Sequence, residues 1–187
     1  PMTMRKNALV GTARMIEAVD RIAKHHPPFA VGTVGSLEVK PNSRNVVPGE
    51  TFFTIDLRHP EMPVLEDMEA EIRRAFDATL RELDLTGTLT RIWEQPPVAF
   101  DATCLDAIRS AVARTGFNAR DIVSGAGHDA VYVSRVTPSA MIFAPCKDGI
   151  SHNEAEFSSL EQCGKAAQVL LLSVLEYDRQ LAAANTR

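Results

Sequence analysis

The sequence predicts a mixed α/β chain in two parts, and three observations lead to this class. Apolar residues recur every three or four positions over residues 4–25, as in an amphipathic helix. Residues 51–58 alternate apolar and polar side chains, as in a half-buried strand. The continuous apolar run 140–144 is typical of a buried parallel strand. A chain that mixes these patterns is expected to pack helices on sheets.

In the first part, two consecutive prolines end the helix predicted over 4–25. Residues 30–39 are rich in β-branched side chains and contain two glycines, which predicts a strand with a bulge or a close backbone approach. A loop over 41–50 turns at a Pro-Gly pair and leads into the strand 51–58.

A second amphipathic helix is predicted over 63–83 and a third strand over 86–93, ending before Pro96-Pro97. The order α-β-β-α-β predicts a small antiparallel sheet with its helices on one face. A layer of this kind normally has a fourth strand, and no strand pattern precedes Met4.

The second part reads helix, strand, helix, strand, helix, over 101–115, 121–124, 130–135, 140–144 and from 158 onward. Gly116 is placed to end the first of these helices. Ser158 and Glu161 have the spacing of a capping box for the last one. Two short strands do not make a stable α/β sheet, so this part is expected to be incomplete by itself.

Composition narrows the classes of partner. The 187 residues carry a net charge of -4 without a run of like charges, which argues against nucleic acid and anionic membrane surfaces. A small molecule or another protein chain is the expected partner. Three cysteines without a C-x-x-C pair indicate a reducing compartment, so we expect a cytoplasmic protein. Neither a long apolar span nor a signal pattern is present in the sequence.

Two polar loops on either side of the run 140–144 hold the residues best suited to chemistry. The first reads S-G-A-G-H-D-A and contains His128. Its glycines, Gly125 and Gly127, allow the backbone to approach a ligand closely. Asp129 is predicted to begin a helix whose free amide protons suit an anion or oxyanion.

The second loop, K-D-G-I-S-H-N-E-A-E, places His152 after the predicted strand, where α/β enzymes bind ligands. A catalytic zinc site needs about three protein ligands. Only His128, Asp129 and Glu154 are near enough in the chain to join His152, and their spacing matches no standard metal motif. A loop histidine that hydrogen-bonds to the backbone is the alternative for His152.

Arg58 lies on the polar face of the predicted strand 51–58, and a guanidinium is well suited to bind a substrate carboxylate. The alternative is a surface ion pair with Asp56 on an edge strand. Asn45, in the loop before this strand, is either a ligand for a substrate amide or a turn residue. A serine hydrolase is disfavoured, because S-G-A-G-H is not the G-x-S-x-G elbow.

At these residues the chain resembles the amidase branch of the M20 metallopeptidase superfamily, with its N-carbamoyl-L-amino-acid hydrolases, allantoate amidohydrolases and β-ureidopropionases. The stretches that carry the resemblance are P-M-T-M-R-K-N-A-L, V-G-T-V-G-S-L-E-V-K-P-N-S-R-N-V-V-P-G-E, F-T-I-D-L-R-H-P, S-G-A-G-H-D-A and M-I-F-A-P-C-K-D-G-I-S-H-N-E-A-E. They span nearly the whole chain in the family's order.

The resemblance implies an α+β lid or dimerisation domain over 1–95 that lacks its first strand. It implies the C-terminal part of an α/β metallopeptidase-like catalytic domain over 96–187. Family members are about twice as long, so the chain corresponds to their C-terminal half. A half-domain with uncovered apolar surface is expected to associate or aggregate.

The resemblance also implies the site. His152 matches the family's last metal ligand, and the general base belongs to the absent N-terminal half. Arg58 and Asn45 match substrate-binding residues of the lid. Gly127, with His128 beside it, matches a loop glycine that contacts substrate.

The implied reaction is hydrolysis of a linear ureido or amide C-N bond by a metal-activated water, with two divalent ions in the full-length enzyme (Zn, Mn, Co or Ni). A homodimer through the lid is implied as well. The isolated chain is expected to hold metal weakly or not at all and to be inactive. An exopeptidase of the same superfamily and a non-catalytic dimerising module remain the alternatives.

Overall fold

The structure is a computed structural model that describes residues 1–184 and divides into two compact units, Pro1–Pro97 and Val98–Arg187. The elements are η1 (Met2–Met4), α1 (Ala8–His25), β1 (Val31–Lys40), β2 (Glu50–Arg58), α2 (Met62–Leu83), α3 (Ala102–Thr115), α4 (Asp129–Val133), η2 (Lys147–Gly149) and α5 (Leu160–Ala184). The predicted mixed α/β class is confirmed. No described helix combines the length and apolarity that a membrane crossing needs.

Helix α1 begins four residues later than the periodicity predicts. Its N-cap is Asn7, whose Oδ1 accepts the backbone N–H groups of Leu9 at 3.1 Å and Val10 at 3.4 Å. Such a cap satisfies amides that have no partner inside the helix. The residues before it form the separate turn η1. Helix α1 ends at His25, as predicted.

Strands β1 and β2 form an antiparallel hairpin, close to the predicted bounds. Gly35 is the extra residue of a bulge, because the register shifts between Val34 and Ser36. Gly32 is a site of close approach, since a Cβ there would lie 3.1 Å from Cγ1 of Val19 on α1. The sequence predicted either a bulge or a close backbone approach in this strand. The structure has both, the bulge at Gly35 and the close approach at Gly32.

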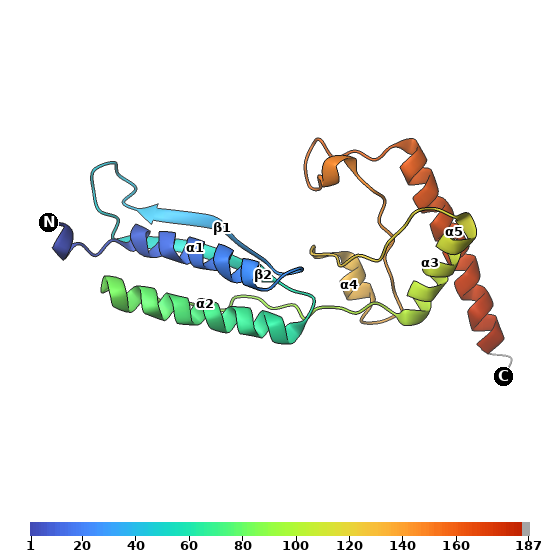
Figure 1. The fold of residues 1–187 in the computed structure, drawn as a ribbon, viewed down its shortest axis with the longest axis horizontal. Helices are drawn as coiled ribbons and strands as arrows, with labels where there is room; N and C mark the ends of the chain where they lie inside the picture. Colours follow the sequence, from blue (N-terminus) through green and yellow to red (C-terminus); the bar gives the residue numbers. More distant parts are fainter. Residues whose placement is uncertain (185–187) are drawn as a thin grey trace. The chain divides into compact units, whose positions relative to one another are not determined.

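Helices α1 and α2 pack beside one another, and α1 contacts both strands (Figure 1). The core between helices and sheet is built on Met15, Val19 and Met68, each at most 1% exposed. Phe53 and Ile55 of β2 pack against it. The alternating residues of β2 therefore turn their apolar side chains to the helices and their polar ones away from them.

The strand predicted over 86–93 is wrong: these residues join no sheet in the described chain. The segment instead lies along α2. A Cβ on Gly87 would meet the Phe76 ring at 3.0 Å, and the carbonyl oxygen of Leu89 accepts a hydrogen bond from Nη1 of Arg73 at 3.3 Å. A strand needs a neighbouring backbone for its hydrogen bonds, and this segment has a helix surface as its neighbour.

In the second unit α3 packs on α5. Ala107 and Ala111 are buried on α3, and their small side chains let the helices approach closely. The Gly116 prediction is confirmed: this residue ends α3 with a positive φ of 68°. The capping box of α5 lies one residue later than predicted. Ser159 and Gln162 exchange side-chain hydrogen bonds with each other's backbone N–H groups, at 3.2 and 2.8 Å.

The strands predicted over 121–124 and 140–144 are also wrong, since neither segment is a strand in the described chain. Ile122 is 53% exposed and Phe143 is 48% exposed, so the apolar side chains are not in a buried sheet. Parallel strands are stable when neighbours pair with them and helices cover both faces. No strand is described in residues 98–184 to supply that pairing.

Candidate functional site

Arg58 is the last residue of β2 and lies on the face of the hairpin that points away from the helices. Its strand neighbours Ile55 and Leu57 pack against the core, so the alternation places Asp56 and Arg58 on the opposite face. In the register Arg58 stands opposite Val31, which is half exposed. Arg58 therefore lies on the polar face at the open end of the hairpin, and its side chain is 49% exposed.

Asp56 holds the Arg58 side chain by two parallel hydrogen bonds. Nε donates to Oδ1 at 2.8 Å, and Nη2 donates to Oδ2 at 2.7 Å. The hydrogen bond from Arg58 lowers the pKa of Asp56, and the same bond raises the pKa of Arg58. The ion pair that the sequence offered as an alternative is thus present. Binding of a substrate carboxylate by Arg58 stays a prediction.

Asn45 is exposed in the loop that joins β1 to β2. The hydroxyl of Ser43 donates a hydrogen bond to Oδ1 of Asn45 at 3.3 Å, and the N–H of Val46 donates to the Ser43 carbonyl at 3.5 Å. These contacts are those of a turn, which is the alternative weighed for Asn45. Its binding of a substrate stays a prediction.

The structure does not bring Asn45 and Arg58 together. Asn45 lies in the loop before β2, and Arg58 is the last residue of that strand. A strand of nine residues is roughly 26 Å long at about 3.3 Å per residue. One small substrate therefore cannot touch both side chains of a single chain.

His128 is the N-cap of the short helix α4. Its Nδ1 accepts the N–H of Ala130 at 3.0 Å, so Nε2 carries the proton of the neutral ring. The predicted helix start at Asp129 is confirmed. The start of α4 offers fewer free amide protons to a ligand than predicted, because the His128 ring accepts the N–H of Ala130.

Gly127 precedes His128 in a loop that leaves space around it. A Cβ built on Gly127 would meet no atom within 4 Å, and the same holds for Gly125. Neither glycine has a positive φ. Packing within the described chain therefore does not explain the glycines, and access for an approaching molecule stays their predicted role.

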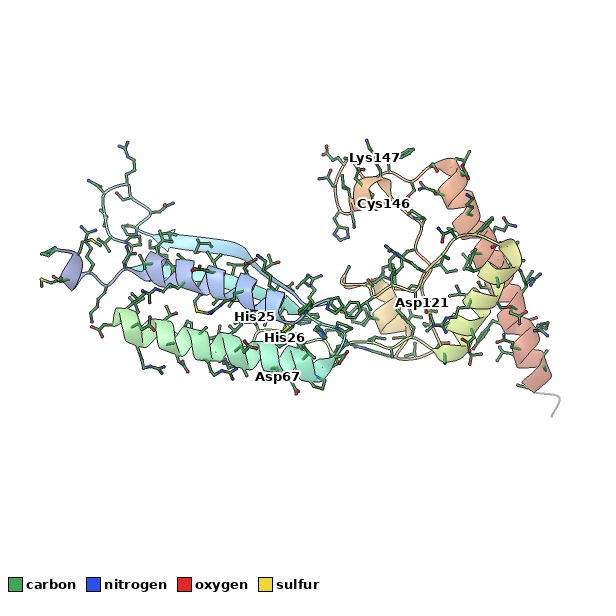
Figure 2. All side chains as sticks on the ribbon, in the orientation of Figure 1. His25, His26, Asp67, Asp121, Cys146 and Lys147 are labelled. Atoms are coloured by element: carbon green, nitrogen blue, oxygen red, sulfur yellow. The ribbon has the colours of Figure 1, made fainter. Side chains whose placement is uncertain are left out.

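His152 lies in a tight exposed loop after η2. The N–H of Lys147 donates to the Phe157 carbonyl at 2.8 Å and closes the loop, whose start is labelled at Cys146 and Lys147 in Figure 2. The N–H of His152 donates to the carboxylate of Glu156 at 3.0 Å. The φ of His152 is 56°, a conformation that non-glycine residues rarely adopt and that is found at functional sites.

The described residues do not form a metal centre. Among residues 1–184 no group of three or more His, Cys, Asp or Glu side chains lies close enough to hold an ion. His128, Asp129 and Glu154 therefore do not complete a ligand set with His152. The role of His152 as one ligand stays a prediction.

The sequence did not predict a contact between a histidine and a carboxylate in the first unit. His25 and His26 end α1, near the start of α2 where Asp67 lies (Figure 2). Nε2 of His26 is 2.8 Å from Oε1 of Glu71 on α2, and both side chains are partly buried. In the sequence, the position of these histidines at the end of a helix indicated only a favourable interaction with the helix dipole. A partner 45 residues away left no local signal.

Two curated relatives of the chain are named as amidohydrolases. The chain is 40% identical over 176 residues to an N-carbamoyl-L-amino-acid amidohydrolase of Rhizobium meliloti, covering 94% of this chain and 42% of the relative. It is 31% identical to an allantoate amidohydrolase of Escherichia coli strain K12, covering 94% of this chain and 43% of the relative. The chain thus spans less than half the length of these curated relatives.

A solved structure shares the fold. The crystal structure of an amidase of the hydantoinase/carbamoylase family from Burkholderia multivorans superposes with a TM-score of 0.90 at 47% identity, covering 95% of this chain and 43% of that one. The sequence profile of peptidase family M20/M25/M40 matches residues 6–176, most of the chain. This chain therefore belongs to peptidase family M20/M25/M40.

Proposed function

We propose that the protein to which this chain belongs is a metal-dependent amidohydrolase. Its substrate is an N-carbamoyl-amino acid, allantoate or a similar ureido acid, and the bond cleaved is a linear C-N bond. The observation that carries the proposal is the 40% identity to an N-carbamoyl-L-amino-acid amidohydrolase over 94% of the chain. Since 58% of that relative has no counterpart here, we expect the isolated chain to be inactive.

Arg58 binds the substrate carboxylate in this proposal. It stands on the polar face of the hairpin, with its side chain about half exposed. A planar guanidinium matches a carboxylate with two parallel hydrogen bonds, which gives both affinity and orientation. All three substrates named above carry such a group.

His152 supplies one metal ligand, and residues outside the described chain supply the others. The support is its constrained loop, in which the backbone of His152 is held by Glu156. A metal site needs a ligand whose position is set before the ion arrives. Gly127 and the Nε2–H of His128 contact the substrate from their own loop.

A homodimer through the first unit is part of the proposal. Asn45 and Arg58 lie at opposite ends of the hairpin, so one copy cannot place both on one substrate. Two copies that pair in opposite directions can bring the loop of one hairpin to the strand end of the other. A cytoplasmic location is proposed because Cys104, Cys146 and Cys163 are all free thiols.

The test is a chimera in which residues 1–187 replace the matching part of the Rhizobium meliloti amidohydrolase. We expect the chimera to hydrolyse N-carbamoyl-L-amino acids or allantoate when supplied with Mn²⁺ or Zn²⁺, and chain 1–187 alone to hydrolyse neither. Arg58→Ala should lower kcat/KM by about a hundredfold, the loss of a charge-assisted hydrogen-bond pair.

His152→Ala in the chimera should lower bound metal as measured by elemental analysis. Lys40→Ala, on the same face of the hairpin, is the control and should leave both readouts unchanged. A folded, metal-loaded chimera that hydrolyses none of these substrates contradicts the proposed function.

A further inference from the structure

We infer that the groove between α1 and α2 is a binding site for a small organic anion that carries phosphate or carboxylate groups. The walls of this groove come from both helices and consist of Arg21, Ile22, His25, Glu71, Arg74 and Ala75. The groove lies in the first unit and contains none of the residues assigned to the proposed hydrolysis. The inference therefore goes beyond the proposed function and does not depend on it.

The basic side chains meet in the groove because of their positions on the two helices. Arg21 and His25 are four residues apart on α1, so their side chains leave the same face of that helix. Arg74 belongs to α2 and lines the same groove. Figure 2 shows His25 at the end of α1, beside α2. Two guanidiniums and an imidazole from helices distant in sequence thus line one groove.

The two arginines of the groove have no partner in the protein. Neither Arg21 nor Arg74 forms a hydrogen bond or an ion pair within residues 1–184. The next residue along α2 shows the contrast, because Arg73 donates to Glu69 through Nε at 2.9 Å and Nη2 at 2.6 Å. A guanidinium without a carboxylate partner keeps its N–H donors for an anion from solution.

The carboxylates near these arginines do not neutralise them. Glu71 lines the groove, but its Oε1 is 2.8 Å from Nε2 of His26, and it contacts neither arginine. Glu17 lies one turn before Arg21 on α1 and forms no ion pair in the part of the chain that the structure describes. The lining therefore holds the guanidiniums of Arg21 and Arg74 against one carboxylate. Such an excess of positive charge attracts anions, and a guanidinium matches the oxygens of phosphate and carboxylate.

The size and lining of the groove fit a small molecule. Its volume is about 350 Å³, and small-molecule sites measure roughly 300–1,000 Å³. Ile22, which is 3% exposed, and Ala75 supply apolar surface for the carbon part of a ligand. A nucleic acid would need a more extended basic surface, and the chain carries a net charge of -4.

The helix dipole is an alternative explanation for part of the cluster. Arg21 and His25 lie near the C-terminus of α1, where positive charge is favourable. Arg74 lies in the middle of α2, and the dipole effect is confined to the first and last turns of a helix. The dipole therefore does not account for the unpaired guanidinium that α2 contributes to the same groove.

The experiment is a titration of chain 1–187 with inorganic phosphate and with succinate, followed by backbone amide NMR. Chloride keeps the ionic strength constant, so that general screening does not change between points. We expect saturable shifts of the amide signals around Arg21 and Arg74. The arm with the lower dissociation constant shows whether the site prefers a phosphate or a carboxylate group.

Variants of the two arginines test the site directly. Arg21→Gln and Arg74→Gln should each raise the dissociation constant about tenfold or more, because a charge-assisted contact is lost. Both side chains are exposed, so the melting temperature should stay unchanged. The matched control is Arg81→Gln, which removes the same charge from α2 outside the groove and should leave the dissociation constant unchanged.

Three results overturn the inference. The first is an equal dissociation constant in the wild type, Arg21→Gln and Arg74→Gln. The second is a response to both anions that grows without saturating. The third is an equal loss in Arg81→Gln, which would assign the binding to the general charge of the chain. Hydrolysis is not measured in this titration, so failure of the proposed function would leave its result unchanged.

Discussion

Glu176 is a buried carboxylate that accepts hydrogen bonds from its own helix and lies near the positive charge of Arg114 on α3. It is 7% exposed on α5 and accepts hydrogen bonds from Nη2 of Arg179 at 2.6 Å, Nε of Arg179 at 3.1 Å and Nε2 of Gln180 at 3.0 Å. The hydrogen bonds from Arg179 and then Gln180 lower the pKa of Glu176 from 4.5 to about 2. A buried charge is tolerated when it is paired in this way.

This shift predicts acid sensitivity of the second unit. A carboxylate with a lowered pKa in the folded state stabilises the fold fully above pH 4.5, and the contribution is lost as the pH falls toward 2. Urea unfolding of the wild type between pH 5 and pH 2 should therefore show a falling free energy of unfolding. Glu176→Gln should flatten that slope, and an equal slope in both proteins contradicts the assignment.

At the scale of elements, the packing of β1 on α1 depends on one glycine. A Cβ at Gly32 would lie 3.1 Å from Val19 Cγ1 and 3.2 Å from both Ala23 Cβ and the Val19 carbonyl oxygen. Two of these three atoms lie at or near the helix backbone, where they cannot move aside. The strand must therefore be free of a side chain where it crosses α1.

Gly32→Ala is expected to lower the free energy of unfolding by about 1–3 kcal/mol, the usual cost of overpacking. Gly35→Ala is the matched control on the same strand, since a Cβ there meets no atom within 4 Å. Thermal or urea unfolding monitored by circular dichroism measures both. Equal stability of the two variants would show that the hairpin and α1 are not in contact at Gly32.

At the scale of the whole chain, α5 exposes a broad apolar surface. Leu170, Leu171, Val174 and Leu175 are each 56–59% exposed. Surfaces of this kind usually contact other protein, and the chain covers only 42–43% of its curated relatives. This apolar surface is therefore a candidate contact for other protein.

We predict that chain 1–187 associates as its concentration rises. Light scattering after gel filtration should show mass increasing with concentration, and Leu171→Lys with Val174→Lys should reduce that mass. The matched control is Lys165→Ala, a charged position of the same helix. A monodisperse monomer that melts cooperatively at all concentrations refutes this prediction.

The helices were predictable from the sequence within a few residues, whereas none of the three strands predicted outside the hairpin forms in the described chain. The apolar spacing over 63–83 and the glycine at 116 led directly to α2 and to the end of α3. The run 140–144 has strand composition yet forms no strand in the described chain. The run is apolar, as the sequence shows. Whether it forms a strand depends on a neighbouring strand to pair with, and the local pattern does not specify one.

The candidate site shows the same division. The alternation of β2 was enough to place Asp56 and Arg58 on one face, and the helix start at Asp129 was readable from the loop before it. Two features of the loops could not be predicted from the sequence. These are the His128 ring as an N-cap and the left-handed backbone at His152, because each depends on the path that its loop takes.

By itself, the sequence determined the helices, the hairpin and the resemblance to the amidase branch of the M20 superfamily. Their signals are local, since helix hydrogen bonds join residues four apart and a strand's faces alternate every two residues. Only the tertiary structure decided that β1 and β2 pair without 86–93, that Gly32 meets Val19 and that His26 meets Glu71. These contacts join residues that are distant in the chain. A local sequence pattern does not specify which distant residue makes the contact.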